Sequence, residues 1–523
     1  MMVSFSNSTL SFHFKRFRPY DSDNILFVST SHFRFIRLIT ARLLNSVPIA
    51  RFHFEQNDFS PFSRVVTACH VGTPLIFSHE NPFRIRVENL LDRGGKVQKT
   101  TEQPAQRRRR QRRKHTRSTT PSSTGICATH SIDNKPQRQQ SPTMVDTSKQ
   151  GFKTTKGCTA LITGSSGLCG ARMTEMLLER GAKTVIAMDV VKPNAALQKR
   201  FDETTAKFPS SELIVLGGKE GDLTDAAAVE KAFEKAKAPI DVVYHIAALV
   251  GPFHDTEKYF QVNVLGTRHI LQCCEKFKVP KLVFSSSPST RFHGPDISGL
   301  REDELTYPET FLAKYAATKA QAEKEVSAAC TDSFFTVSIA PHQVYGPHDG
   351  LFFPKIMETA GNGRLRIFGK GKNKISVCYV DNYCHGMFCG ADELYKDSPI
   401  LGKFYIITDT VPVEFWGILN DAAVQLGFAD MKKKFHLPTS LLYSIAYICT
   451  FLGYILNKKF KLSPFNVRMM TIDRYFSPVN SKKDLKYEPL KGFPEAWQLT
   501  IDWFKVNWLP GFLEANGMKA KQS

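Results

Sequence analysis

The sequence lacks the cysteine spacing of a zinc ribbon or a disulfide-stapled fold. Its 11 cysteines form no CxxC pair, so we expect no metal site and a reducing compartment. Hydrophobic residues make up 42% and charged residues 23% of the 523 residues, which is the balance of a globular protein. These values exclude a collagen-like or wholly disordered chain, and the length predicts two or three domains.

Acidic residues are scarce at the beginning of the chain. Residues 1–143 hold 23 Lys and Arg against 9 Asp and Glu, a net charge of +14 out of the +21 of the whole sequence. The remaining 380 residues hold 47 against 40, a net charge of +7. The basic excess therefore belongs mainly to the N-terminal segment, and we expect no nucleic acid among the partners of the globular part.

The N-terminal segment has no sustained hydrophobic periodicity. It carries the basic run Arg107–Lys114 in a context rich in Ser, Thr, Gln and Pro, and such a composition repels itself and has little to bury. We predict that residues 1–150 form a disordered basic extension. Because the composition changes abruptly near Met144, we also expect translation to begin at that methionine.

A glycine-rich turn between an apolar strand and a helix predicts a dinucleotide site. Residues 158–163 are typical of a buried strand, the sequence TGSSGLCG leads into a helix over 171–180, and a second strand over 184–188 ends at Asp189. In such a βαβ unit the glycines let backbone N–H groups approach a pyrophosphate, while the carboxylate binds the adenosine ribose. The pattern of strand, turn, helix and carboxylate therefore favours a cofactor site over a merely structural turn.

Six residues of this unit are assigned to the cofactor: Gly164, Ser166, Gly167, Leu168, Gly170 and Asp189. Because the Asp189 carboxylate repels a 2′-phosphate, we expect NAD rather than NADP. Lys192 and Arg172 lie close by in the sequence and keep NADP as the alternative.

Strands and helices continue to alternate, which predicts an α/β fold with a Rossmann-type, doubly wound parallel sheet. Further strands are expected over 212–216, 241–246 and 281–286. Ligands of such sheets gather at the carboxyl ends of the strands. Five more residues at or beyond those ends are therefore expected to contact the cofactor: Asp222, Leu223, Ala247, Ala248 and Asn263.

A tyrosine and a lysine in a YxxxK pattern predict acid–base chemistry. Tyr315 and Lys319 lie on one face of a helix expected over 311–328. A lysine ammonium lowers the pKa of a neighbouring phenol, and the same lysine can hold the nicotinamide ribose. The serine run 285–287 ends the preceding strand and offers a hydroxyl to a substrate oxygen.

These motifs resemble those of the extended short-chain dehydrogenase/reductases. The matching motifs are TGSSGLCG, Asp189, HIAA, NVLGT, the serine run, YAATK and PHQVYGP (341–347). The chain is similar to the 3β-hydroxysteroid dehydrogenase branch, and within it to the decarboxylating sterol-4α-carboxylate 3-dehydrogenases. This finer similarity rests on SIAPHQVYGPHD (338–349), the GNGR turn (361–364), GKGKNKISVCYVDNYCHG (369–386), FYIITDTVPVEFW (404–416) and FHLP (435–438).

The resemblance covers about residues 151–510 and implies an NAD-binding domain over 151–345 and a substrate-binding region over 346–523. It implies a catalytic set of Tyr315, Lys319 and Ser287, with Ser286 as the alternative serine. It also implies oxidation of the 3β-hydroxyl of a 4α-carboxysterol, with loss of carbon dioxide.

The segment after the strand that follows 281–286 supplies the remaining assignments. The resemblance makes Pro341 a cofactor contact, and many relatives carry Arg where this chain has Ala340. His342 is either a donor to the carbonyl oxygen of the product or a structural histidine.

A long uncharged stretch predicts contact with a membrane. Residues 437–457 contain 21 uncharged residues in a row, with lysines on both flanks. A span needs about 20 apolar residues, and positive charge at both ends favours a helix that lies on one side. We predict monotopic association, with a buried core helix as the alternative.

The C-terminal lysines Lys519 and Lys521 resemble a retrieval signal. Together with the apolar stretch, they predict the cytosolic face of the endoplasmic reticulum membrane, with lipid droplets as a second location. Expected partners are a sterol substrate, that membrane surface, other enzymes of sterol C4 demethylation and a second copy of the chain.

Three alternative functions stay open at this point. The first is a 3β-hydroxysteroid dehydrogenase/isomerase without decarboxylation, and the second is a nucleotide-sugar epimerase, whose soluble substrate needs no membrane. The third is an NAD-sensing scaffold, which would need no YxxxK pair.

Overall fold

The computed structural model describes residues 153–518 except 252, 253, 457, 459 and 461, together with short strands nearer the N-terminus. The chain divides into the units Met1–Asn134 and Lys135–Ser523. The described elements of the first unit are paired strands: β1 (Met2–Ser6) with β2 (Thr9–His13), β3 (Cys69–His70) with β4 (Thr73–Pro74), and β5 (Ile76–Phe77) with β6 (Ile85–Arg86). The expected disorder of residues 1–150 otherwise lies outside the described residues.

The second unit is built on a seven-stranded sheet in the order β17-β13-β11-β10-β7-β8-β9, and every neighbouring pair is parallel. Its strands are β7 (Thr159–Thr163), β8 (Thr184–Asp189), β9 (Glu212–Gly217), β10 (Val242–His245), β11 (Lys281–Ser285), β13 (Phe335–Pro341) and β17 (Phe404–Ile407). The predicted doubly wound parallel α/β fold is confirmed.

The central strands are buried on both faces, which explains their unbroken apolar sequences. Ala160, Leu161 and Ile162 of β7 are fully buried, and so are Val185 and Ile186 of β8. A parallel sheet covered by helices on both sides excludes water from both faces, so its strands need no polar alternation.

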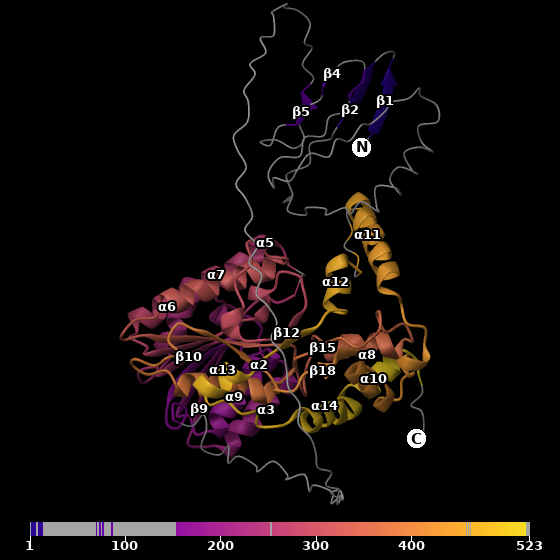
Figure 1. The fold of residues 1–523 in the computed structure, drawn as a ribbon. Helices are drawn as coiled ribbons and strands as arrows, with labels where there is room; N and C mark the ends of the chain where they lie inside the picture. Colours follow the sequence, from indigo (N-terminus) through magenta and orange to yellow (C-terminus); the bar gives the residue numbers. More distant parts are fainter. Residues whose placement is uncertain are drawn as a thin grey trace, which may run out of the picture. The chain divides into compact units, whose positions relative to one another are not determined.

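Helices cover the two faces of the sheet (Figure 1). One face carries α2 (Leu168–Glu179), α3 (Ala195–Lys207) and α9 (Val380–Asp392). The other carries α4 (Ala226–Glu234), α6 (Gly266–Lys276) and α7 (Lys314–Ala328). Short helices connect these elements: η2 (Gly218–Gly221), α5 (Thr256–Phe260), η3 (Gln261–Leu265), η4 (Pro288–Arg291) and η5 (Glu302–Glu304).

The chain returns to this sheet after residue 345. Strand β17 extends the sheet beside β13, and α9 packs on α2. The domain boundary predicted at residue 345 therefore cuts through one layered body, because the parallel pairing of β17 joins residues that are far apart in the sequence.

The rest of the second unit forms two small sheets and a group of helices. One sheet has the order β12-β19-β15-β18, and the other pairs β14 with β16. Their strands are β12 (Ile297–Leu300), β14 (Val344–Tyr345), β15 (Lys374–Ile375), β16 (Cys378–Tyr379), β18 (Val413–Glu414) and β19 (Arg474–Phe476). The helices are α8 (Phe353–Gly361), α10 (Phe415–Gln425), η6 (Met431–Lys433), α11 (Thr439–Leu456), α12 (Pro464–Met469), α13 (Val479–Asp484), α14 (Phe493–Asn507) and α15 (Leu509–Ala515).

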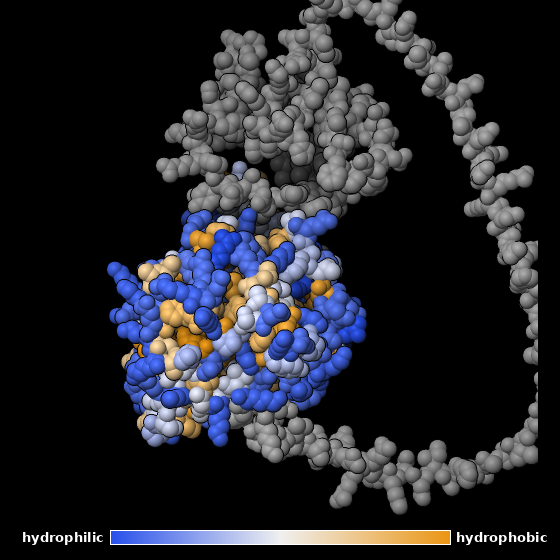
Figure 2. All heavy atoms as spheres, turned by 90° about the vertical axis from the view of Figure 1, so that its left-hand side faces the viewer, coloured by the Kyte–Doolittle hydropathy of each residue, from blue (hydrophilic) through white to orange (hydrophobic). Residues whose placement is uncertain are grey.

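The surface of the sheet layer is mostly hydrophilic on the face drawn in Figure 2, with small apolar patches between the charged residues. Helix α11 differs from that surface. Among the described residues it is the one helix long and apolar enough to cross a membrane, with a mean hydropathy of 1.6, and 11% of it is buried. Only Leu442 and Ala446 of α11 are buried, in a cluster with Val467.

Candidate active site

The glycine turn after β7 has no room for side chains. Gly164 has a φ of +79°, and a Cβ there would lie 2.9 Å from the backbone of Ala247. A Cβ on Gly170 would lie 2.0 Å from the carbonyl oxygen of Gly164. Helix α2 begins at Leu168 after Gly167, and no side chain caps its first N–H groups. These free N–H groups form an anion-binding helix terminus of the kind that holds a pyrophosphate.

Asp189 ends β8 beside this turn. Its Oδ2 accepts a hydrogen bond from the Ser166 backbone N–H at 2.9 Å, and its Oδ1 accepts one from the Val191 N–H at 2.8 Å. The carboxylate is therefore fixed next to the glycine turn while its remaining lone pairs are free to accept ribose hydroxyls. The Ser166 hydroxyl itself donates to the Val191 carbonyl at 2.6 Å.

The basic residues that kept NADP as an alternative differ in their partners. Arg172 binds Asp381 at 2.8 Å and Glu179 at 2.7 Å. Lys192 packs its side chain against Gly217. The Arg172 guanidinium is thus committed to carboxylates within the chain rather than free for a 2′-phosphate.

The strand-end residues predicted to contact the cofactor fall into two groups. Asp222 and Ala247 lie half-buried at the carboxyl edge of the sheet, as does Ala248. Leu223, in contrast, buries its side chain in the core against Gly266. Leu223 can therefore offer its backbone, but not its side chain, to a ligand at the edge of the sheet.

Asn263 holds the loop after β10 against helix α7. Its Oδ1 accepts a hydrogen bond from the Leu249 N–H at 2.8 Å, and its Nδ2 donates to the Leu249 carbonyl and to Thr318 Oγ1, both at 3.2 Å. The buried side chain joins the loop after β10 to helix α7, which carries Tyr315. Its carboxamide is therefore occupied within the chain.

Tyr315 and Ser287 are brought together from two elements. Ser287 caps η4 directly after β11, and Tyr315 lies in the first turn of α7. Burial raises the pKa of Tyr315, and a hydrogen bond from Ser287 lowers it. The Ser287 hydroxyl also pairs with the Ser289 hydroxyl at 2.8 Å.

The neighbouring serines face other partners. Ser286 is buried and its hydroxyl donates to Glu323, whereas Ser285 accepts a hydrogen bond from the Tyr383 hydroxyl at 2.7 Å. Of the three serines, Ser287 is thus the one whose hydroxyl lowers the pKa of Tyr315.

Lys319 is buried one helical turn beyond Tyr315. Its Nζ donates to the carbonyl oxygen of Ser285 at 2.5 Å and lies 4.0 Å from the centre of the Phe284 ring. Burial lowers its pKa to about 7, and the charge of Glu323 opposes that shift. The sequence predicted that Lys319 lowers the pKa of Tyr315, but that pKa is raised and Lys319 is not among the groups that shift it. Among the described side chains no hydrogen bond joins the two, because the ammonium points to the end of β11.

Sequence reasoning missed a buried acid beneath this site. Glu323 binds Arg291 at 2.5 Å and accepts a hydrogen bond from the Tyr307 hydroxyl at 2.7 Å, in addition to that from Ser286. It fastens η4 to α7 and so fixes the distance between Ser287 and Tyr315. Its spacing four residues after Lys319 was a signal, since it repeats the face of the YxxxK pair.

The end of β13 closes the site. Pro341 is half-buried at the strand end, and Ala340 is buried in a cluster with Phe292 and Phe476. His342 donates from Nδ1 to the Ser376 carbonyl at 2.6 Å, since a carbonyl can only accept, and burial lowers its pKa to about 3. The ring is therefore neutral with Nε2 as an acceptor, so it does not supply the donor that was one of its two expected roles.

The chain matches the model of the 3-beta hydroxysteroid dehydrogenase/isomerase family over residues 161–438. It is 30% identical over 339 residues to the 2-alkyl-3-oxoalkanoate reductase of Stenotrophomonas maltophilia (strain K279a), covering 64% of this chain and 96% of that protein. It is 28% identical over 387 residues to the human decarboxylating sterol-4-alpha-carboxylate 3-dehydrogenase, covering 73% and 95%.

Solved structures of the same fold include a double mutant of DesIV, a dTDP-glucose 4,6-dehydratase from Streptomyces venezuelae, determined with NAD and DAU bound. The TM-score is 0.50 at 20% identity, and the match covers 68% of this chain and 99% of that one. The likeness agrees with the parallel sheet described above. With the glycine turn, the Tyr315 helix and the match over 161–438, the chain belongs to the 3-beta hydroxysteroid dehydrogenase/isomerase family and is an oxidoreductase acting on CH–OH groups.

Proposed function

We propose that the chain is an NAD-dependent dehydrogenase that oxidises the 3β-hydroxyl of a 4α-carboxysterol and releases the carboxyl group as carbon dioxide. One observation carries this proposal: the Ser287 hydroxyl, which lowers the pKa of Tyr315, lies with that phenol at the carboxyl edge of the parallel sheet, in a chain of this family.

The names of the two relatives describe closely related substrates. A sterol 4-carboxylate that is oxidised at C3 and a 3-oxoalkanoate share one arrangement. In each, the carboxyl group is attached to the carbon next to the carbon that bears the hydroxyl or keto oxygen. Both are thus β-hydroxy or β-keto acids. A sterol is favoured here because helix α11 offers an exposed apolar surface, and a sterol resides in membranes.

The residues of the site suit removal of a proton from a hydroxyl. Tyr315, as phenolate, accepts the proton of the substrate hydroxyl, and Ser287 holds the oxygen. Because burial raises the pKa of Tyr315, turnover should increase with pH. Lys319 and Glu323 fix α7 against the end of β11, which holds the two hydroxyls in place.

The chain's own residues fit NAD. The glycine turn leads into α2, whose first N–H groups have no side-chain cap and suit a pyrophosphate, and the Asp189 carboxylate is aligned for the adenosine ribose. Arg172 is engaged by Asp381 and Glu179, which favours NAD over NADP. When bound, NAD supplies the acceptor for the hydride that leaves the carbon bearing the hydroxyl.

Oxidation converts the substrate into a β-keto acid that can lose its carboxyl group. The bond between C4 and the carboxyl carbon breaks, carbon dioxide leaves, and the electron pair passes to the carbonyl as an enolate. Tyr315, which now carries the proton, and Ser287 donate hydrogen bonds to that oxygen and stabilise the charge. Protonation of the enolate at C4 gives the ketone.

Helix α11 supports association with a membrane. Phe451 is 64% exposed and Tyr454 is 87% exposed, and large exposed apolar patches mark interaction surfaces. The alternative of a buried core helix conflicts with this exposure. We infer that the enzyme lies on the cytosolic face of the endoplasmic reticulum membrane, beside other enzymes of sterol C4 demethylation.

A comparison of three substrates tests the proposal. The full chain in detergent with NAD should form NADH with a 4α-carboxysterol. A nucleotide sugar should give none, and a 3β-hydroxysterol without the carboxyl group should react more slowly. Equal rates with the two sterols would favour a dehydrogenase without decarboxylation, and no NADH with either, despite NAD binding, would favour the sensing scaffold.

A further inference from the structure

One arginine at the edge of the site is charged, enclosed and without an acidic partner. Arg474 begins β19, and its Nε is buried with no hydrogen-bond partner. Among the described residues it forms no ion pair, and burial lowers its pKa to about 10. Two other enclosed arginines differ, because Arg291 binds Glu323 and Arg172 binds Asp381.

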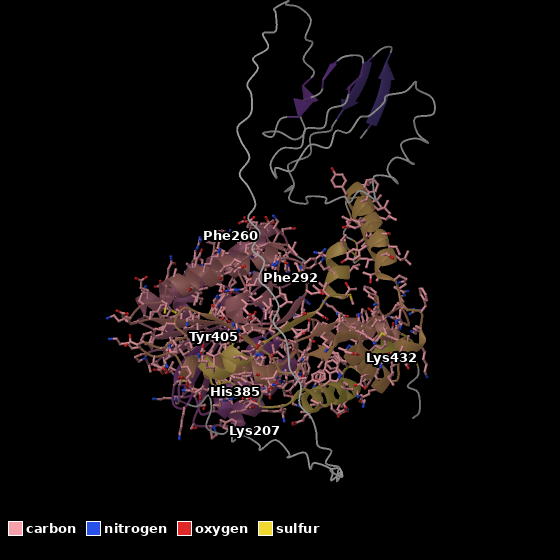
Figure 3. The ribbon with its side chains drawn as sticks, viewed as in Figure 1. Lys207, Phe260, Phe292, His385, Tyr405 and Lys432 are labelled. Carbon is pink, nitrogen blue, oxygen red and sulfur yellow. The ribbon has the colours of Figure 1, made fainter. Side chains whose placement is uncertain are left out.

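Arg474 lies between the loops that follow β11 and β13. Its Cζ is 5.8 Å from the centre of the Phe292 ring, and Phe292 directly follows η4, the short helix capped by Ser287. On the other side, the charge of Arg474 contributes to the lowered pKa of His342, the residue after Pro341. Figure 3 labels Phe292, between α5 and α12 in that view.

The pairing of β19 explains how a residue so late in the chain reaches this edge. Arg474 is opposite Ile297 of β12 and Ile375 of β15, and β12 follows the Ser287 loop in the sequence. The small sheet thus brings the C-terminal part of the chain to the carboxyl edge of the large one.

Burying a charge without a partner costs free energy unless a ligand of opposite charge binds it. Arg474 is half-buried as a residue, while its Nε is closed off from solvent and has no partner. A guanidinium is planar and donates two parallel hydrogen bonds, which matches a carboxylate. His342 is neutral and Ala340 is apolar, so neither of them competes for an anion.

We propose that Arg474 binds the carboxylate of the substrate, which is attached one carbon from the reacting hydroxyl. This inference rests on the proposed function and gives its substrate class a physical basis. A carboxylate on Arg474 and a hydroxyl between Tyr315 and Ser287 fix the substrate at two points, so the enzyme selects β-hydroxy acids over neutral alcohols.

Arg474→Met tests the proposal, with Arg364→Met, an exposed arginine on another turn, as the control. Loss of a charge-assisted bidentate pair should raise the Kd and the KM for the 4α-carboxysterol by about 10- to 100-fold. The KM for a 3β-hydroxysterol without the carboxyl group and the Kd for NAD should stay unchanged. Arg474→Lys should recover part of the lost affinity, since lysine restores the positive charge but not the two parallel hydrogen bonds of a guanidinium.

A second readout needs no turnover. Because Arg474→Met removes an uncompensated buried charge, its Tm without substrate should be at or above that of the wild type. Equal losses for both sterols, or a Tm well below the wild type, would overturn the proposal and make Arg474 structural. A wild type that binds the carboxysterol more tightly than the variant but forms no NADH would refute the proposed function alone.

Discussion

The three consecutive serines 285–287 have different hydrogen-bond partners and therefore different roles at this site. Ser285 is bonded to Tyr383 and Ser286 to Glu323, and these bonds hold the end of β11 in position. The Ser287 hydroxyl pairs with Ser289 and lowers the pKa of Tyr315. The backbone direction at each residue therefore separates bracing groups from the group offered to a substrate.

Replacing Tyr315 by Phe removes the proton acceptor and keeps the ring. We expect turnover to fall by about 10²–10⁴-fold, the usual contribution of general acid–base catalysis, while the Kd for NAD changes little. NADH formation and a fluorescence titration with NAD measure the two quantities. Turnover near the wild-type rate would mean that another group removes the proton.

The lowered pKa of Lys319 should make the free energy of unfolding depend on pH. Its pKa is about 7 in the folded chain and near 10.5 when unfolded. Between these values the unfolded chain binds more protons, so the stability rises with pH, and below about 7 the full cost of the buried charge remains. Relative to Lys319→Met, wild-type stability should gain ~1.4 kcal/mol per pH unit above pH 7. Denaturant titrations without NAD at pH 6 to 9 measure this difference, and a constant difference would rule out the lowered pKa.

At the scale of elements, sequence patterns predicted the sheet well and the second layer poorly. The strands expected over 184–188, 212–216 and 281–286 correspond to β8, β9 and β11 within one residue, because a buried parallel strand is a local apolar run. Strand β17 joins the same sheet through pairing with β13. No local pattern encodes such a long-range pairing.

The candidate site also combines features that local sequence patterns predict with features that depend on long-range contacts. Tyr315, Lys319 and the glycine turn were visible as spaced motifs, whereas the bond from Ser286 to Glu323 depends on how η4 lies against α7. Arg474 reaches the sheet edge through pairing of β19 with β12 and β15. Neither its burial nor its lack of an acidic partner among the described residues can be predicted from neighbours in the sequence.

The glycine turn is the element most sensitive to one added carbon. Gly170→Ala would put a Cβ 2.0 Å from the Gly164 carbonyl oxygen, so the turn must open and NAD binding should be lost. The control is Gly511→Ala in α15, where nothing lies within 4 Å of the added Cβ. Calorimetric titration with NAD compares the two. Normal NAD binding by Gly170→Ala would show that the turn does not hold the cofactor.

For the whole molecule, the exposed apolar helix α11 is the proposed contact with the membrane. Phe451→Glu should reduce binding of the full chain to phospholipid vesicles by ~10-fold, because one exposed aromatic side chain no longer enters the bilayer. Val506→Glu on α14 is the matched control, since Val506 is 74% exposed on a different helix. Vesicle flotation measures both, and equal binding by the two variants would separate α11 from the membrane.

The fate of the carboxyl carbon tests the proposed decarboxylation. A 4α-carboxysterol labelled at that carbon is incubated with the full chain and NAD, and released carbon dioxide is counted against NADH. We expect one labelled carbon dioxide for each NADH, together with a 3-ketosterol that has lost the label. NADH with the label retained in the sterol would contradict decarboxylation, and no NADH from a protein that binds NAD would contradict the dehydrogenase itself.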